Sequence, residues 1–252
     1  MPTKNLTFPG STGAMLSASV DYPDGEVQAW ALFAHCFTCN RKMPSASRTC
    51  RELARRGIAA VRFDFTGLGD SEGDFAATTF ATNIADLQAA YDFMEEHLQA
   101  PEVLIGHSLG AAAAINAVSE MPHVQAVATI GAPFSALEAM ERLAAETGDF
   151  AADGSEVLHF YGRTIPLTPQ VWEALRQVDA QAAIEGLNRP LLVVHSPSDR
   201  VVDVNESARI YAAANFPKSV MSLDGADHLL RRKGSAARAA GLIYEWAQEY
   251  IP

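Results

Sequence analysis

The sequence predicts an α/β fold with a mainly parallel sheet of about eight strands and helices on both faces. Three observations support this prediction. Short apolar runs alternate with segments of helical periodicity along most of the chain. The runs are continuous rather than alternating, as at 29–34, which is typical of strands buried on both faces. The chain has 252 residues, 48% of them hydrophobic, which suits one α/β domain with a sizeable core.

The expected strands are short apolar runs bounded by turn residues or by helices. The first two flank Pro9-Gly10, and Asp24-Gly25 marks the turn before the third. In chain order, the predicted strands are 6–8, 15–22, 29–34, 58–63, 103–105, 124–130, 191–195 and 219–223.

Helical periodicity fills most of the intervals between these strands. The segment 78–98 places Ile84, Leu87, Tyr91 and Met94 three or four residues apart, which predicts a long amphipathic helix. The other predicted helices are 46–56, 111–118 and 236–250.

The segment 134–187 interrupts the alternation, because it is longer than an ordinary crossover between strands. It contains helical pieces at 137–146 and 169–177, with a hairpin at 157–165 between them. We interpret it as a cap inserted into a single domain, 1–252, over the carboxyl ends of the strands, where ligands of open α/β sheets bind. The alternative is an elaborated crossover without a role in binding.

The stretch around Ser108 matches the G-x-S-x-G pattern. An apolar run leads into it and an Ala-rich helical run leads out, which is the strand, sharp turn and helix that a nucleophile elbow requires. Gly106 and Gly110 are expected where strand and helix approach too closely for side chains. The alternative is a glycine-rich turn with an idle serine.

The partners of this serine are expected downstream, in the order serine, acid, histidine. A serine hydroxyl needs a base to remove its proton, and His228 follows the last predicted strand. His159, in the insertion, is its rival. Asp199 follows the strand 191–195 and is the expected acid, with Asp203 as its rival and a plain turn role as the alternative.

The oxyanion of an acyl-transfer reaction needs two backbone N–H donors. One is expected from Leu109, the residue after the nucleophile, and the other from the loop after the third strand. Phe37 is the predicted donor in that loop, with Thr38 as the alternative, because Cys36 stands where many serine hydrolases have glycine.

These motifs resemble those of α/β-hydrolase fold serine esterases, and more narrowly the hydrolase part of bacterial proteins that fuse an α/β hydrolase to an OsmC-like domain. The resemblance implies an α/β-hydrolase fold and hydrolysis of small carboxylic esters through an acyl-enzyme, with Ser108, Asp199 and His228 as the catalytic triad and no metal or cofactor. The matching segments are 35–39, 62–73, 105–110, 128–133, 195–197 and 222–228.

Other functions remain open at this point. The same triad serves thioesterases, feruloyl-type esterases, acyltransferases and peptidases. A hydrolase scaffold can also bind ligands without catalysis. A thiol-redox protein would act through Cys36 and Cys39, and would lose activity in Cys39→Ala but keep it in Ser108→Ala.

The three cysteines predict reduced thiols rather than a disulfide framework. Cys36 and Cys39 form a C-x-x-C, but a zinc site needs about four ligands and the chain has no second such pair. We therefore expect these thiols to pack within a loop, in a cytoplasmic protein.

Composition limits the partners. The formal net charge of -11 argues against nucleic acid or an anionic membrane. No apolar run approaches the roughly 18 residues of a membrane span, and the N-terminus lacks the pattern of a signal peptide. The expected partner is a small-molecule ester. The oligomeric state stays open, with a homodimer as one option.

The predicted insertion supplies candidates for a substrate pocket. Its large apolar side chains are equally candidates for the insertion's own core, and no long amphipathic lid is present, which favours small soluble esters. The basic stretch 231–233 is either a solvated patch or an attractor for an acidic substrate. The pocket candidates are Met140, Phe160, Tyr161 and Trp172, together with Phe150.

Overall fold

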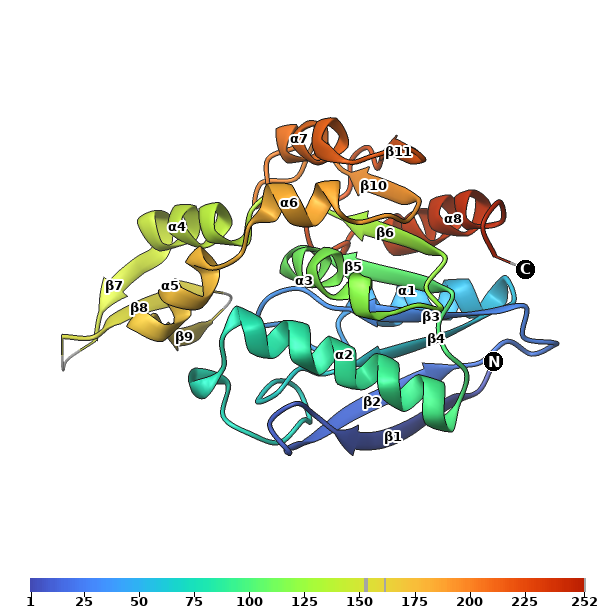
Figure 1. Ribbon diagram of the computed structural model, residues 1–252, viewed down its shortest axis with the longest axis horizontal. Coiled ribbons are helices and arrows are strands. Elements are labelled where there is room, and N and C mark those ends of the chain that lie inside the picture. Colours follow the sequence, from blue (N-terminus) through green and yellow to red (C-terminus); the bar gives the residue numbers. More distant parts are fainter. Residues whose placement is uncertain (152–153, 161, 252) are drawn as a thin grey trace.

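The computed structural model describes residues 1–151, 154–160 and 162–251 (Figure 1). Eight strands form one sheet in the order β1-β2-β4-β3-β5-β6-β10-β11, and every pair from β4 to β11 is parallel. Only β1 and β2 run antiparallel to their neighbours. The predicted α/β fold with a mainly parallel sheet is therefore confirmed. The strands are β1 Thr3–Pro9, β2 Met15–Asp21, β3 Ala29–Ala34, β4 Ile58–Phe63, β5 Val103–His107, β6 Ala126–Ile130, β10 Leu191–His195 and β11 Lys218–Ser222.

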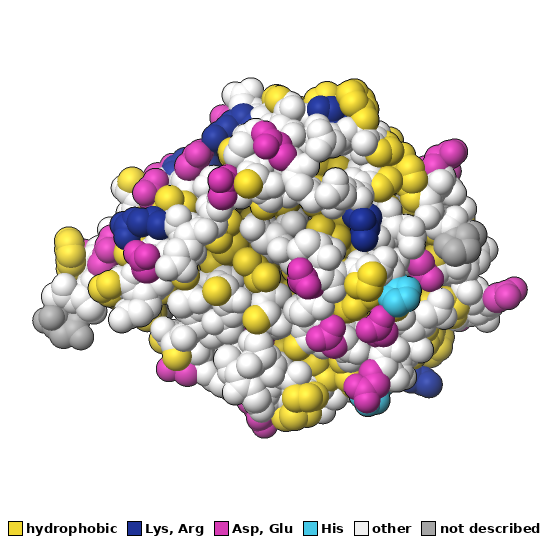
Figure 2. Space-filling model, viewed as in Figure 1, with side chains coloured by type: hydrophobic (Ala, Val, Ile, Leu, Met, Phe, Trp, Pro, Cys, Tyr) yellow, Lys and Arg dark blue, Asp and Glu magenta, His cyan; other side chains and the backbone are white. Residues whose placement is uncertain are grey.

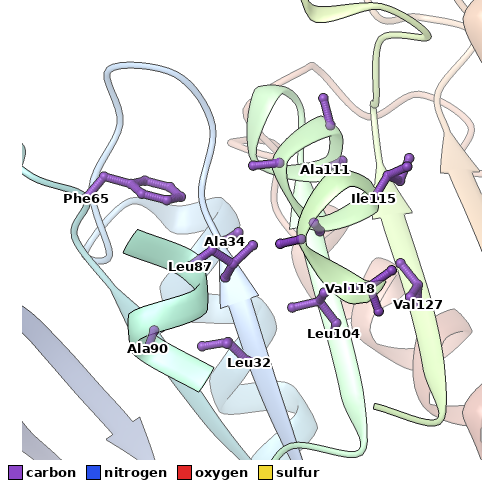
Figure 3. Close-up of a cluster of buried hydrophobic side chains, with 14 of the residues drawn as sticks. Leu32, Ala34, Phe65, Leu87, Ala90, Leu104, Ala111, Ile115, Val118 and Val127 are labelled. Atoms are coloured by element: carbon purple, nitrogen blue, oxygen red, sulfur yellow. The ribbon is translucent and has the colours of Figure 1, made fainter. Parts of the chain in front are cut away.

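Helices cover both faces of the sheet because each buries an apolar stripe on it. Helices α2 (Phe80–His97) and α3 (Leu109–Ala117) pack on one face, and Figure 3 shows their side chains meeting those of β3, β5 and β6. Helices α1 (Pro44–Arg55) and α8 (Ser235–Ala247) contact each other and cover the opposite face.

Helix α2 begins where the sequence provides a cap. The side chain of Thr79 accepts a hydrogen bond from the N–H of Thr82, whose own hydroxyl accepts one from the N–H of Thr79. This reciprocal pair satisfies two backbone donors that have no partner within the helix. It places the start of α2 two residues after the predicted one.

Two short helices were missed by the sequence analysis. Helix α6 (Ala180–Glu185) and helix α7 (Asn205–Ala213) flank β10 in the chain and pack on the face that carries α3. Each buries a single apolar side chain, Ile184 or Ile210, so neither has the repeated apolar spacing by which a longer helix is recognised.

The segment from α4 to α5, residues 136–176, forms a separate layer at one end of the sheet (Figure 1, left). It consists of α4 (Ala136–Thr147), a three-stranded antiparallel sheet, and α5 (Pro169–Arg176), which packs against α2. The hairpin was expected, but β7 was not, because it is an exposed tripeptide. The strands of this small sheet are β7 Gly148–Phe150, β8 Glu156–Phe160 and β9 Arg163–Pro166.

Candidate active site

Parallel strands bring the predicted site residues to one edge of the sheet. Ser108 follows β5 and Asp199 lies in the loop after β10, while His228 lies in the loop after β11. Because the carboxyl ends of neighbouring parallel strands face the same way, residues far apart in sequence meet here.

Ser108 occupies a strained turn between β5 and α3. Its φ of 55° and ψ of -124° lie outside the regions that most residues adopt. A Cβ on Gly106 would lie 2.2 Å from the Cα of Ala111, and one on Gly110 would lie 2.3 Å from the carbonyl oxygen of His35. Both glycines are therefore required by the close approach of strand, helix and neighbouring loop.

Ser108, His228 and Asp199 form one continuous chain of hydrogen bonds. The Oγ of Ser108 lies 3.0 Å from Nε2 of His228, and Nδ1 of that ring lies 2.7 Å from Oδ2 of Asp199. The other carboxylate oxygen, Oδ1, accepts hydrogen bonds from the N–H groups of Val201, at 2.8 Å, and Val202, at 3.0 Å. Such a chain connects a nucleophile to a base and the base to an orienting acid.

Asp199 remains ionised in this environment. Burial by itself raises the pKa of its carboxyl, but the hydrogen bond and charge of His228, with the N–H groups of Val202 and Val201, outweigh burial and hold the pKa below its usual value. The carboxylate is thus available to stabilise a positively charged His228 ring.

The alternative acid, Asp203, and the alternative base, His159, lie away from Ser108. Asp203 is exposed and accepts a hydrogen bond from the N–H of Asn205, at the start of α7. His159 is an exposed residue of β8, where its Nδ1 lies 3.2 Å from the hydroxyl of Thr164. Neither is hydrogen-bonded to Ser108 or His228 in the described part of the chain.

His107 supports the site in a way that the sequence did not reveal. Its ring is buried, and its Nε2–H donates a 2.8 Å hydrogen bond to the backbone carbonyl of His228. Burial first, and then the nearby His228 ring, lower the pKa of His107 to about 3, so the ring is neutral. Through this hydrogen bond, the neutral ring of His107 fixes the backbone of the segment that carries His228.

Gly131 is a second supporting residue, at the end of β6. Its φ is 56°, and a Cβ there would lie 3.2 Å from Oδ2 of Asp199 and 3.4 Å from Nδ1 of His228. A side chain at this position would press on the pair, so the space beside it depends on glycine. In the sequence, Gly131 was notable only as part of the segment 128–133, one of the segments that carry the family resemblance.

The loop after β3 borders the same cavity as Ser108. Phe37 and Leu109 both line that cavity, and Leu109 is the first residue of α3, so its N–H has no partner within the helix. Two sets of contacts through Arg41 fix this loop. The backbone N–H and the guanidinium of Arg41 both bind the buried carboxylate of Asp64, and Arg62 donates a 2.8 Å hydrogen bond to the carbonyl of Arg41.

The prediction of reduced thiols in this loop is wrong. Cys36 and Cys39 form a disulfide, with their Cα atoms 5.4 Å apart, a separation typical of such bonds. The tight turn through Thr38, whose φ is 57°, brings the two residues together. Cys50 is a free thiol buried in α1, and burial raises its pKa. The cysteines therefore supply no argument for a reducing compartment.

A cavity of about 160 Å³ opens beside Ser108. Of the predicted pocket residues, Met140 and Phe160 line it. Trp172 lines a different hollow, where Phe150 also lies, and donates its indole N–H to Glu156 at 3.2 Å. Tyr161 lies outside the described residues.

Other features of the described chain bear on partners. No group of three or more His, Cys, Asp or Glu side chains is placed to hold a metal within it. None of its helices has both the length and the apolar character needed to cross a bilayer. Figure 2 shows acidic side chains spread over one face, with Lys and Arg side chains at separate places rather than in a continuous basic patch.

Comparisons with known proteins agree with this architecture. Residues 25–166 match the family described as serine aminopeptidase, S33. The esterase domain of a Rhodothermus marinus protein is 38% identical, with full coverage of both chains and a TM-score of 0.82. The ferulic acid-bound Est1E of Butyrivibrio proteoclasticus is 18% identical, covers 97% of this chain and 99% of its own, and has a TM-score of 0.82, a likeness of fold.

An uncharacterized protein of Mycobacterium tuberculosis (strain H37Rv) is 27% identical over 175 residues. The matched region covers 68% of this chain but 53% of that protein, so the chain spans about half the length of this curated relative.

Proposed function

The chain belongs to the serine aminopeptidase S33 family of α/β hydrolases, and on that premise we propose that it is a serine carboxylesterase that hydrolyses small to medium carboxylic esters. One observation carries the proposal. The hydroxyl of Ser108, the ring of His228 and the carboxylate of Asp199 are linked at 3.0 Å and 2.7 Å beside an open cavity.

The proposed reaction has two acyl-transfer steps. His228 takes the proton of Ser108 as the oxygen attacks the ester carbonyl, and Asp199 stabilises the imidazolium. The N–H groups of Phe37 and Leu109 bind the oxyanion, and loss of one such donor typically raises the barrier by about 2.7–4 kcal/mol. The alcohol leaves with a proton from His228, and water then attacks the acyl-enzyme in the same way.

The size of the cavity favours small substrates. An apolar cavity of about 150 Å³ holds one benzene-sized molecule. The cavity beside Ser108, at about 160 Å³, therefore suits a short acyl chain or a single ring. We propose that the insertion 134–187 acts as a cap, because Met140 and Phe160 from it line this cavity.

An ester is a better substrate class for this cavity than a peptide with a free amino terminus. An aminopeptidase needs an anionic group for the substrate's ammonium, and such groups bind through charge-assisted hydrogen bonds. Within the described chain, Glu146 is the one acidic side chain that lines the cavity, against the two basic side chains of Arg142 and Arg200.

The narrower resemblance to hydrolases fused to an OsmC-like domain stays part of the proposal. It rests on the segments named above, whereas the similarity to the esterase domain of a Rhodothermus marinus protein supports the esterase part alone. On this proposal the chain works as the esterase unit, and an OsmC-like partner would be sought by co-purification from the native host.

The test is hydrolysis of p-nitrophenyl esters of two to sixteen carbons by the wild type and by Ser108→Ala. We expect activity on short chains that disappears in the variant. Ser45→Ala is the matched control, since Ser45 is also buried and its hydroxyl has no hydrogen-bond partner in the described chain.

Two results would contradict the proposal. If a folded wild type hydrolyses no ester of the series, the esterase assignment fails. If activity survives in Ser108→Ala but is lost in Cys39→Ala, the chemistry belongs to the disulfide Cys36–Cys39 instead.

A further inference from the structure

We propose that the substrate is an ester that carries a free carboxylate, which the guanidinium groups of Arg142 and Arg200 bind. This inference rests on the proposed esterase function and specifies its substrate class. It starts from the charges inside the cavity beside Ser108, where both arginines are part of the lining.

The two arginines reach the cavity from different parts of the chain. Arg142 projects from α4 of the insertion and is half-buried, whereas Arg200 directly follows Asp199 in the loop after β10. A substrate seated at Ser108 would therefore meet a cation from the insertion and another from the main sheet.

Neither arginine forms a salt bridge in the described part of the chain, although the charge of Arg142 helps to lower the pKa of Glu138. Across residues 1–151, 154–160 and 162–251, no carboxylate oxygen lies within 4.0 Å of the guanidinium nitrogens of Arg142 or Arg200, and neither side chain makes a hydrogen bond. Glu138, one turn before Arg142 on α4, is taken by Arg209, whose two terminal nitrogens lie 2.6 and 3.0 Å from its oxygens.

An unpaired guanidinium beside a reaction site favours an anionic ligand. The planar fork of arginine matches a carboxylate in a bidentate manner. Glu146 also lines the cavity, four residues after Arg142, but it is exposed and forms no salt bridge with that arginine in the described chain. Even a salt bridge between exposed side chains of this spacing would contribute little, so Glu146 does not prevent a substrate carboxylate from binding Arg142.

The attraction of Arg142 and Arg200 for an anion is confined to the cavity beside Ser108. The protein as a whole is acidic, with a formal net charge of -11, and acidic side chains are spread over the face in Figure 2. In the basic stretch 231–233, the two arginines bind groups of the protein itself: Arg231 pairs with Asp227 at 3.0 Å, and Arg232 donates to the carbonyl of Gly225.

The test compares anionic esters with neutral amides of the same shape. Monomethyl adipate against methyl adipamate places the charge on the acyl side. 4-Acetoxybenzoate against 4-acetoxybenzamide places it on the alcohol side. The measurement is the ratio of kcat/KM for each pair. We expect the anionic ester of at least one pair to be preferred tenfold or more, the factor that corresponds to one hydrogen bond to a charged group.

Variants then assign the preference. Arg142→Gln and Arg200→Gln should each lower the ratio at least threefold, and Glu146→Gln should raise it. Arg176→Gln is the matched control, since Arg176 lies on α5 of the same insertion and lines the hollow beside Trp172 instead. The preference should also weaken at high salt.

The possible failures are distinguishable. Ratios near one or below it, with both neutral esters hydrolysed, would overturn the anionic-substrate proposal and leave the esterase function standing. A preference that persists in both arginine variants would place the carboxylate elsewhere and also overturn it. If the p-nitrophenyl series and both pairs go unhydrolysed by a folded wild type, the esterase function itself fails.

Discussion

Acidification should destabilise this protein through His107, the buried ring that holds the backbone of His228. An unstructured histidine titrates near pH 6.5, whereas burial lowers the pKa of His107 to about 3 in the folded protein. Between these values the unfolded state binds a proton that the folded state does not. The stability that His107 contributes is therefore present above pH 6.5 and is lost as the pH falls toward 3.

The size of the effect follows from the two pKa values. At pH 7 both states are mostly neutral at this position. At pH 5 the unfolded ring is almost fully protonated and the folded ring is not, so the free energy of unfolding falls by about 2 kcal/mol through His107. Any folded pKa below about 4 gives nearly the same result at this pH.

The variant His107→Gln isolates this contribution. Glutamine supplies an N–H for the carbonyl of His228 but does not titrate. The free energy of unfolding would be measured by urea denaturation at pH 7 and pH 5 for both proteins, with m-values compared. We expect the decrease between the two pH values to be about 2 kcal/mol smaller in the variant. His195, whose pKa burial also lowers, is common to both proteins.

An equal decrease in wild type and variant would refute this reasoning, because His107 would then titrate alike in the folded and unfolded states. The change in stability at a single pH does not decide the matter, since the substitution also alters packing. Only the difference between the two pH dependences does.

Three further predictions concern the site. Asp199→Asn should lower kcat by roughly 10⁴, because an amide does not stabilise the charged base; steady-state kinetics measure this, and a decrease below tenfold would contradict it. Gly106→Ala should lower the free energy of unfolding by about 3 kcal/mol or more, and with it the melting temperature, because the added Cβ would lie 2.2 Å from the Cα of Ala111. Gly25→Ala is its control: a Cβ at that position has no atom within 4 Å, so the melting temperature should stay nearly unchanged. Reduction of Cys36–Cys39 should loosen the loop that carries Phe37, the proposed oxyanion donor, and so lower kcat. The activity of the Cys39→Ser variant should be low and insensitive to dithiothreitol, and an equal response of both proteins to dithiothreitol would exclude the disulfide as the cause.

The fold was predictable because its signals are local. Each strand of the parallel sheet is a continuous apolar run such as 29–34, and long helices such as α2 repeat their apolar residues at a fixed spacing. The exceptions are α6, α7 and β7, which bury too few apolar side chains to show any period. The grouping of Ser108 with residues 91 and 120 positions further along the chain could be expected only because the order of strands in such sheets is regular.

The sequence by itself determined the α/β architecture and the expected nucleophile, base and acid, since each depends on a pattern within a few residues or on chain order. Tertiary structure alone decided that Cys36 and Cys39 are bonded, that His107 supports the backbone of His228, and that Arg142 and Arg200 line one cavity. These features depend on which distant elements approach one another. No local pattern of residues records the distance between two loops, and it is this distance that fixes charge, burial and bonding at the site.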